Sequence, residues 1–317
     1  GAVGYLVGEA GHGLEYMFVM MNAARLSVGL EGYAVAERAF QQAAEWARTR
    51  AQGRPPVSVA SGPAPIIHHP DIKRMLLTMK ANTEAMRALA IYAASQLDVA
   101  AAHADEATRA AAQVRGDLLI PVVKAWSTEG GIESASLGIQ VHGGMGYIEE
   151  TGAAQAYRDV RITTIYEGTT GIQANDLLGR KLGRDRGTAM AALLADIAHE
   201  LEAITASDPA VQAARHRALE GVAELAQATK ALLGLLGSAQ DHALAVAVPY
   251  LKLTGTVLGG WLHAKSAAIA AARLAAGGAD ADFYRSKLAT ARFYAEHILP
   301  TAEAPARVVQ RGGAAVA

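Results

Sequence analysis

The sequence contains no cysteine, which excludes disulfides, thiolate catalysis and zinc sites built on cysteine. It also has no uncharged apolar stretch long enough for a membrane span and no signal-peptide pattern. Its 29 basic and 30 acidic residues are interspersed, so no block of positive charge predicts a surface for nucleic acid. We therefore expect a soluble protein, with the cytoplasm as the default location.

Aromatic residues make up only 5% of the 317 residues, and runs of β-branched residues are scarce. Alanine dominates instead, and helix formers outnumber strand formers almost everywhere, so the composition predicts an all-α fold. The 51% of hydrophobic residues suffices for a large core. Residues 1–13 are typical of the tail of a β-rich segment, and the chain starts without methionine, so we expect a piece of a longer protein.

Apolar residues recur at helical spacing in two groups of segments. The first group predicts an antiparallel helical bundle over residues 14–183, with helices over 14–50, 71–103, 106–137 and 150–159. Within it, Gly29 and Gly32 are candidate breaks, Pro121 is a candidate kink, and a proline-rich loop covers 54–70. The second group predicts a smaller bundle over residues 188–306, with helices over 188–206, 209–237, 241–276 and 282–303. No carboxylate and histidine pairs recur there at metal-ligand spacing.

One carboxylate stands at a joint between predicted helices, in the stretch Ile165-Tyr166-Glu167-Gly168-Thr169-Thr170-Gly171-Ile172-Gln173. A side chain at such a joint can face a cavity, and partial desolvation there would suit an acid or base. However, Thr170 and Gln173 have the spacing of a capping box, so Glu167 could equally stabilise a helix N-terminus. On pattern alone the capping interpretation is favoured.

Two further features are each weak evidence for a binding site when taken singly. Gln140-Val141-His142-Gly143-Gly144-Met145-Gly146 places three glycines within four residues, which lets a ligand approach the backbone closely but also suits a simple turn. No strand precedes it, so it is not a dinucleotide-binding fingerprint. Asn22 and Arg25 lie three apart and share a helix face, which alone indicates a solvated face or an interhelical hydrogen bond.

Together these residues resemble a known family. Ile165-Tyr166-Glu167-Gly168-Thr169, preceded by Tyr157-Arg158-Asp159 and combined with Gln140-x-x-Gly143-Gly144-x-Gly146, is similar in order and spacing to the C-terminal half of an acyl-CoA dehydrogenase. The helices after residue 188 resemble the C-terminal extension of the larger bacterial members. The resemblance implies that the family's N-terminal helical domain and β-domain are absent from this chain.

The resemblance implies a role for each matching position. Glu167 would remove the α-proton of an acyl thioester while the β-hydrogen leaves as hydride to flavin N5, and its backbone N–H would help to bind the thioester oxygen. Tyr166 and Gly168 would contact the substrate. Asn22 and Arg25 match an Asp-x-x-Arg pair that meets the CoA moiety and supports the site, although Asn22 replaces the usual aspartate.

The remaining matches concern FAD. Arg50 would pair with a phosphate of the cofactor, although the phenylalanine of the family's Arg-x-x-Phe-Gly is missing here. Gln140, Gly143 and Gly144 match the segment that contacts the FAD of the neighbouring subunit. The positions along the flavin would be Thr169, Gly171, where many members carry glutamine, and Gln173.

The implied function is FAD-dependent α,β-dehydrogenation of an acyl-CoA, with no metal, by a homodimer or dimer of dimers that passes electrons to an electron-transferring flavoprotein. Two alternatives remain at this stage. One is a non-catalytic helical assembly module that retains the fold, which flavin absorbance would discriminate. The other is an acyl-CoA oxidase, which uses the same residues and is separated by peroxide production.

Overall fold

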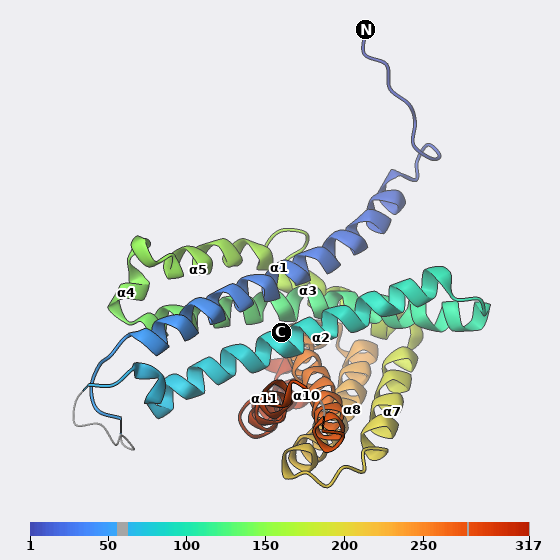
Figure 1. Cartoon of the computed structure of the whole chain (residues 1–317). Coiled ribbons are helices and arrows are strands. Elements are labelled where there is room, and N and C mark those ends of the chain that lie inside the picture. Colours follow the sequence, from blue (N-terminus) through green and yellow to red (C-terminus); the bar gives the residue numbers. More distant parts are fainter. Residues whose placement is uncertain (56–62, 278, 317) are drawn as a thin grey trace.

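A computed structural model describes residues 1–55, 63–277 and 279–316 of the chain. The described part contains helices and no strand, which confirms the all-α prediction (Figure 1). Residues 1–12 are exposed and form no regular element, and residues 56–62 of the expected proline-rich loop lie outside the described residues. Among the described helices, none combines the length and apolarity that crossing a membrane requires.

Three long helices form the first layer: α1 (Gly13–Thr49), α2 (Pro70–Ala102) and α3 (Glu106–His142). Helix α2 runs antiparallel to α1 and α3, which are parallel to one another. A Cβ on Gly29 would lie 2.7 Å from Val123, and one on Gly32 would lie 2.6 Å from the backbone of Ser127. The expected break in α1 at these glycines was wrong, because they let α1 approach α3 closely within a continuous helix.

Helix α3 continues through Pro121 and ends five residues later than expected, at His142. Short elements then carry the chain back along the bundle: α4 (Gly144–Tyr147), α5 (Ala153–Arg161) and α6 (Thr170–Asp176). The chain does not turn directly after α6, because a π-helix over Leu177–Gly183 continues this helix. The actual turn lies at Arg186 and Gly187, both with positive φ.

The C-terminal half contains α7 (Thr188–Glu202), α8 (Pro209–Ser238), α9 (Gln240–Ala245), α10 (Ala247–Ala275), α11 (Ala281–Phe293) and α12 (Glu303–Arg311). Two expected helices are therefore interrupted. The helix expected over 241–276 is broken at Val246, and the one expected over 282–303 passes through a π-turn at Tyr294–Ile298 and a 3-10 turn at Leu299–Ala302 before α12.

The second bundle packs on the first and shares one hydrophobic core with it. Helix α10 packs against α3 and α6. Trp126 of α3 lies directly over Gly255 and Gly259 of α10, where a side chain would collide with its ring. This packing places the C-terminal half immediately behind α6, the helix that begins just after Glu167.

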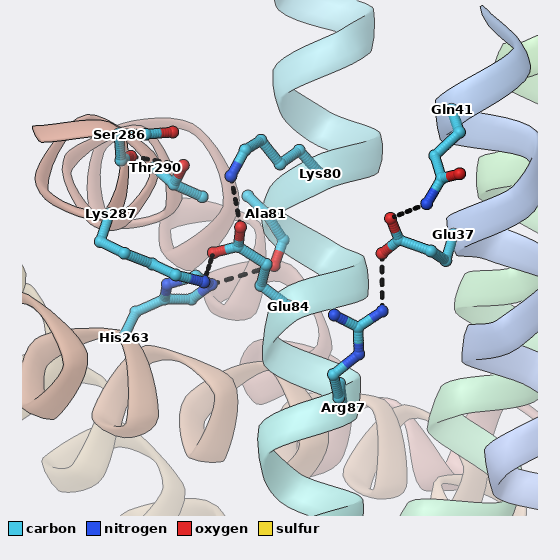
Figure 2. A network of polar contacts seen from close by, with 10 residues as sticks. All are labelled: Glu37, Gln41, Lys80, Ala81, Glu84, Arg87, His263, Ser286, Lys287 and Thr290. Carbon is cyan, nitrogen blue, oxygen red and sulfur yellow. Dashed lines mark hydrogen bonds and ion pairs between the residues drawn. The ribbon is translucent and has the colours of Figure 1, made fainter. Parts of the chain in front are cut away.

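A polar network also joins the two bundles, between α2 and the helices α10 and α11 (Figure 2). Glu84 of α2 pairs with Lys80 one turn earlier and with Lys287 of α11 at 2.9 Å. His263 of α10 is buried and its Nε2 donates to the carbonyl of Ala81 at 2.9 Å. The two lysines hold the pKa of Glu84 below its ordinary value in spite of its burial.

Candidate active site

Glu167 lies in the short connection between α5 and α6, after the 3-10 turn Ile162–Thr164. Its φ is 54°, in the left-handed region, and the φ of the following Gly168 is 92°. A non-glycine residue is uncommon in this region, and such residues concentrate at functional sites. Two successive left-handed residues turn the chain sharply, and Glu167 is presented at the turn.

The capping interpretation from the sequence was wrong in its register. The N-cap of α6 is Thr169, whose Oγ1 accepts from the N–H of Ile172 at 3.3 Å. Thr170 instead donates to Glu129 of α3 at 2.6 Å. Glu167 lies two residues before the N-cap, so capping does not account for its carboxylate.

The Glu167 carboxylate is half-buried, and its Oε2 is buried without a hydrogen-bond partner in the described part of the chain. A buried carboxylate oxygen normally accepts a hydrogen bond, since leaving one unpaired costs about 1–3 kcal/mol or more for a charged group. Oε2 of Glu167 is therefore an acceptor that the described side chains leave available.

Two side chains hold the backbone of this turn. Lys124 of α3 is fully buried, and its Nζ donates to the carbonyl of Gly168 at 2.7 Å. Gln173 of α6 is also fully buried, and its Nε2 donates to the carbonyls of Glu167 and Gly168, both at 3.2 Å. The Gln173 amide nitrogen thus supports the turn, whereas its Oε1 is buried without a hydrogen-bond partner among the described residues, and its expected contact with the flavin stays a prediction.

Arg25 and Asp176 lie behind the turn. Arg25 of α1 is buried and its Nη1 pairs with Oδ2 of Asp176 at 3.0 Å. Its Nη2 is 3.8 Å from the point where a Cβ on Gly168 would lie, so the guanidinium lies close to the turn. Arg25 is therefore buried beside the turn, and its two expected roles, supporting the site and meeting the CoA moiety, stay predictions. Asn22 is half-buried one turn earlier.

Tyr166 forms the rim of the site. Its hydroxyl donates to the carboxylate of Glu31 on α1, and this hydrogen bond raises the pKa of Tyr166 to about 12. Tyr166 is 37% exposed, so part of the residue is accessible to a bound molecule. Gly171 is half-buried and Thr169 is exposed, which leaves both accessible beside Glu167.

The other expected cofactor residues form a second cluster at the C-terminal end of α3, whereas the Glu167 turn lies beside the middle of that helix. Gln140, Gly143 and Gly144 are exposed, and no described residue lies within 4 Å of a Cβ placed on either glycine. Arg50, also exposed, ends α1 at this same end, where Trp46 of α1 stacks on His142 of α3 at 5.1 Å. The structure therefore brings Arg50 to Gln140–Gly144, and places both far from Glu167.

The separation of the two clusters follows from helix geometry. Lys124, beside Gly168, and Gln140 are sixteen residues apart on α3, roughly 24 Å at 1.5 Å per residue. Gly146, which completes the glycine run, has a different role: a Cβ there would come within 2.9 Å of His142, so it lets α4 fold back on α3.

Comparison with known proteins identifies the family. Residues 11–182 match the family model "Acyl-CoA dehydrogenase, C-terminal domain", and residues 190–317 match "Acetyl-CoA dehydrogenase C-terminal like". The first match alone covers more than half of the chain. The chain belongs to the acyl-CoA dehydrogenase family.

Individual relatives of this family agree. The 3-methylmercaptopropionyl-CoA dehydrogenase of Ruegeria pomeroyi is 49% identical over 298 residues, which are 94% of this chain and 50% of that protein. The broad-specificity linear acyl-CoA dehydrogenase FadE5 of Mycobacterium tuberculosis is 33% identical over 321 residues, 98% of this chain and 52% of that protein. The chain thus spans about half the length of these curated relatives.

A solved acyl-CoA dehydrogenase from Bacillus anthracis, complexed with FAD, shares the fold with a TM-score of 0.72. Its sequence identity is 20%, and the match covers 95% of this chain and 51% of that chain. The similarity extends over both bundles, so the arrangement of the C-terminal half on the family's helical domain is shared as well.

Sequence reasoning missed three residues that support this candidate site: Lys124, Asp176 and Glu31. The sequence did contain a signal for Lys124, because it is the single charged residue in the apolar stretch 118–126. A lysine is rarely buried unless a polar group pairs with it, so its position indicates such a partner. For Asp176 and Glu31 the sequence contained no signal, because their partners lie 151 and 135 residues away in the sequence.

Proposed function

We propose that this chain provides the catalytic base of an FAD-dependent acyl-CoA dehydrogenase, with Glu167 removing the α-proton of the acyl thioester. The observation that supports this most is the buried, unpaired Oε2 of Glu167 on a backbone held in the left-handed region. General base catalysis of this kind contributes roughly 10²–10⁴-fold, provided that the base is positioned against the proton. Lys124 and Gln173 provide that positioning through the carbonyls beside Glu167.

The residues present fit FAD. Gly143 and Gly144 leave their backbone open to a large ligand, because none of the described residues occupies the space where their side chains would lie. Arg50 is an exposed guanidinium at the same end of the bundle, and its planar fork can bind phosphate oxygens in pairs. When bound, FAD would accept the hydride that leaves the β-carbon. The chain itself holds the base, contributes the Glu167 N–H toward the thioester oxygen, and forms the rim at Tyr166.

The roughly 24 Å between the two clusters favours a homodimer. The resemblance assigns Gln140–Gly144 to the FAD of the neighbouring subunit, and their distance from Glu167 agrees with contacts to two different cofactor molecules. Each site would then be completed by a partner copy. An electron-transferring flavoprotein is the proposed acceptor of the electrons, and an acyl-CoA thioester the proposed substrate.

The test of this function uses the FAD-loaded protein. Glu167→Gln should retain flavin absorbance and lower the acyl-CoA-dependent reduction of an acceptor dye by at least 10²-fold, because the amide cannot take a proton. Retention of the wild-type rate would contradict the proposed role. Absence of flavin from the wild-type protein would favour the helical assembly module, and stoichiometric peroxide in air would favour the oxidase.

A further inference from the structure

Lys124 is a fully buried lysine in the middle of α3, surrounded in sequence by the apolar stretch 118–126. Burying an ammonium is costly unless it is paired and hydrogen-bonded. Its hydrogen bond is to the carbonyl of Gly168, a neutral group, at 2.7 Å. A methionine or leucine would fill the same space without that cost, so packing does not explain why a lysine stands here.

The charges facing Lys124 come from three elements. Arg25 of α1 repels its ammonium, whereas Glu129 of α3 and Glu167 of the turn attract it. Asp176 of α6 compensates Arg25 at 3.0 Å. Burial first, and Arg25 second, lower the pKa of Lys124 to about 8. The ammonium form therefore prevails at neutral pH, and a moderate rise in pH removes its charge.

The turn that Lys124 contacts needs an external support. Glu167 and Gly168 both have positive φ, and a non-glycine residue in this region carries a cost of order 1–3 kcal/mol. Such a conformation persists only when its surroundings determine it. The cap at Thr169 fixes the start of α6 after the turn, and Gln173 reaches the turn from the same helix. Lys124 anchors the turn itself to α3, a separate element, while Thr170 at the start of α6 donates to Glu129 of the same helix.

We propose that Lys124 is a positioning residue that holds the Gly168 carbonyl and thereby aims the Glu167 carboxylate at the substrate α-carbon. This inference rests on the proposed function of Glu167. The charge matters as well as the hydrogen bond, because a charge-assisted bond is roughly twice as strong as a neutral one. Loss of the proton from Lys124 weakens the anchor, so the rate of the chemical step should fall above about pH 8.

The experiment compares Lys124→Met with the wild type, both FAD-loaded, using an acyl-CoA substrate with and without deuterium at the α-carbon. In K124M the kcat should fall roughly 10–100-fold, the KM should change less than about threefold, and the α-deuterium isotope effect on kcat should rise, because a misaimed base makes proton removal slower. The alkaline decline near pH 8 should disappear from the profile of K124M.

Lys287→Met is the control, since Lys287 is a half-buried lysine that pairs with Glu84 away from the turn. It should lower the melting temperature and leave kcat, the isotope effect and the pH profile unchanged. A second measurement does not depend on turnover: amide hydrogen exchange over residues 166–171 should be at least tenfold faster in K124M and unchanged in K287M.

The outcomes separate the two proposals. Full activity of Glu167→Gln would overturn the proposed function. If E167Q is inactive but K124M keeps the wild-type kcat, isotope effect and alkaline decline, the positioning role is overturned and the proposed function stands. Should K124M fail to fold, the wild-type profile decides: a rate that does not decline between pH 7.5 and 9 contradicts the positioning role.

Discussion

Arg25 and Asp176, 151 residues apart in the sequence, form a buried ion pair with 3.0 Å between Nη1 and Oδ2. The pair joins α1 to the C-terminal end of α6, so it fixes the helix that begins just after Glu167. Arg180 approaches the same carboxylate at 3.7 Å, and its guanidinium also lies over the ring of Phe18 in α1. The position of α6 is thus set by charges as well as by the core behind it.

Removing one member of this pair should lower the free energy of unfolding far more than removing both. Asp176→Asn leaves the Arg25 guanidinium buried and unpaired, for which the expected loss of unfolding free energy is about 3–5 kcal/mol. Arg25→Met combined with Asp176→Leu should recover a large part of that loss, because neither member of the pair is then left buried without its partner. Denaturant unfolding of the single and double variants measures the coupling directly.

An exposed ion pair provides the control for this cycle. Arg292 and Glu296 are paired at 2.8 Å on the surface of the C-terminal half. Glu296→Gln should leave the denaturation midpoint unchanged, since solvent screens such pairs. Equal midpoint shifts for Asp176→Asn and Glu296→Gln would contradict the role given to burial.

Gly168 is the second position where a small change should have a large effect. Its φ is 92°, and a Cβ there would lie 2.6 Å from Nε2 of Gln173. Gly168→Ala should therefore displace either the turn or the Gln173 amide, costing about 1–3 kcal/mol of stability and at least tenfold in kcat. Thermal unfolding and dye reduction by the FAD-loaded variant measure the two effects.

Gly234 is the matched glycine for that substitution. It is helical in α8, and nothing lies within 4 Å of the position of its Cβ. Gly234→Ala should raise stability by roughly 0.5–1 kcal/mol, because alanine lowers the entropy of the unfolded chain and favours the helix. If both substitutions changed stability in the same direction, the backbone conformation of Gly168 would not explain the effect of Gly168→Ala.

His263, buried where α10 meets α2, should make the stability of the fold depend on pH. Burial lowers the pKa of His263 from 6.5 to about 4, and its neutral ring donates to Ala81 (Figure 2). Below pH 6.5 the unfolded chain binds a proton that the folded chain does not, so stability falls as the pH falls toward 4. Across that window the loss is on the order of 3 kcal/mol.

Melting temperatures measured between pH 7 and 5 test this. Glu84 contributes a loss in the same direction, mainly below its ordinary pKa of 4.5. Glu224, whose pKa burial raises above 4.5, contributes in the opposite direction, so the contribution of His263 is read from the difference between the wild type and His263→Phe above pH 5. His263→Phe should flatten the slope in that range, whereas His199→Gln, at an exposed site on α7, should leave it unchanged. A slope that persists in His263→Phe would assign the effect to another group.

Several features of the site could be predicted from the sequence because they are local. The spacing of Glu167, Gly168 and Thr169 and the glycines after Gln140 are written in consecutive residues, and helical periodicity gave the long helices. The register of the cap was not predictable, since Thr169 and Thr170 are chemically equivalent and only the positive φ of the preceding residues decides between them. The interruption of the helices at Val246 and Tyr294 likewise depends on packing.

The sequence alone determined that the chain is helical, that it resembles acyl-CoA dehydrogenases, and that Glu167 stands at a helix joint. Tertiary structure decided what surrounds that joint: the lysine of α3 beneath the turn, the Arg25–Asp176 pair behind it, and the separation of Glu167 from Gln140 along α3. The physical reason is that secondary structure follows from near-neighbour periodicity, whereas buried charges are stable only beside partners that folding brings from distant parts of the chain.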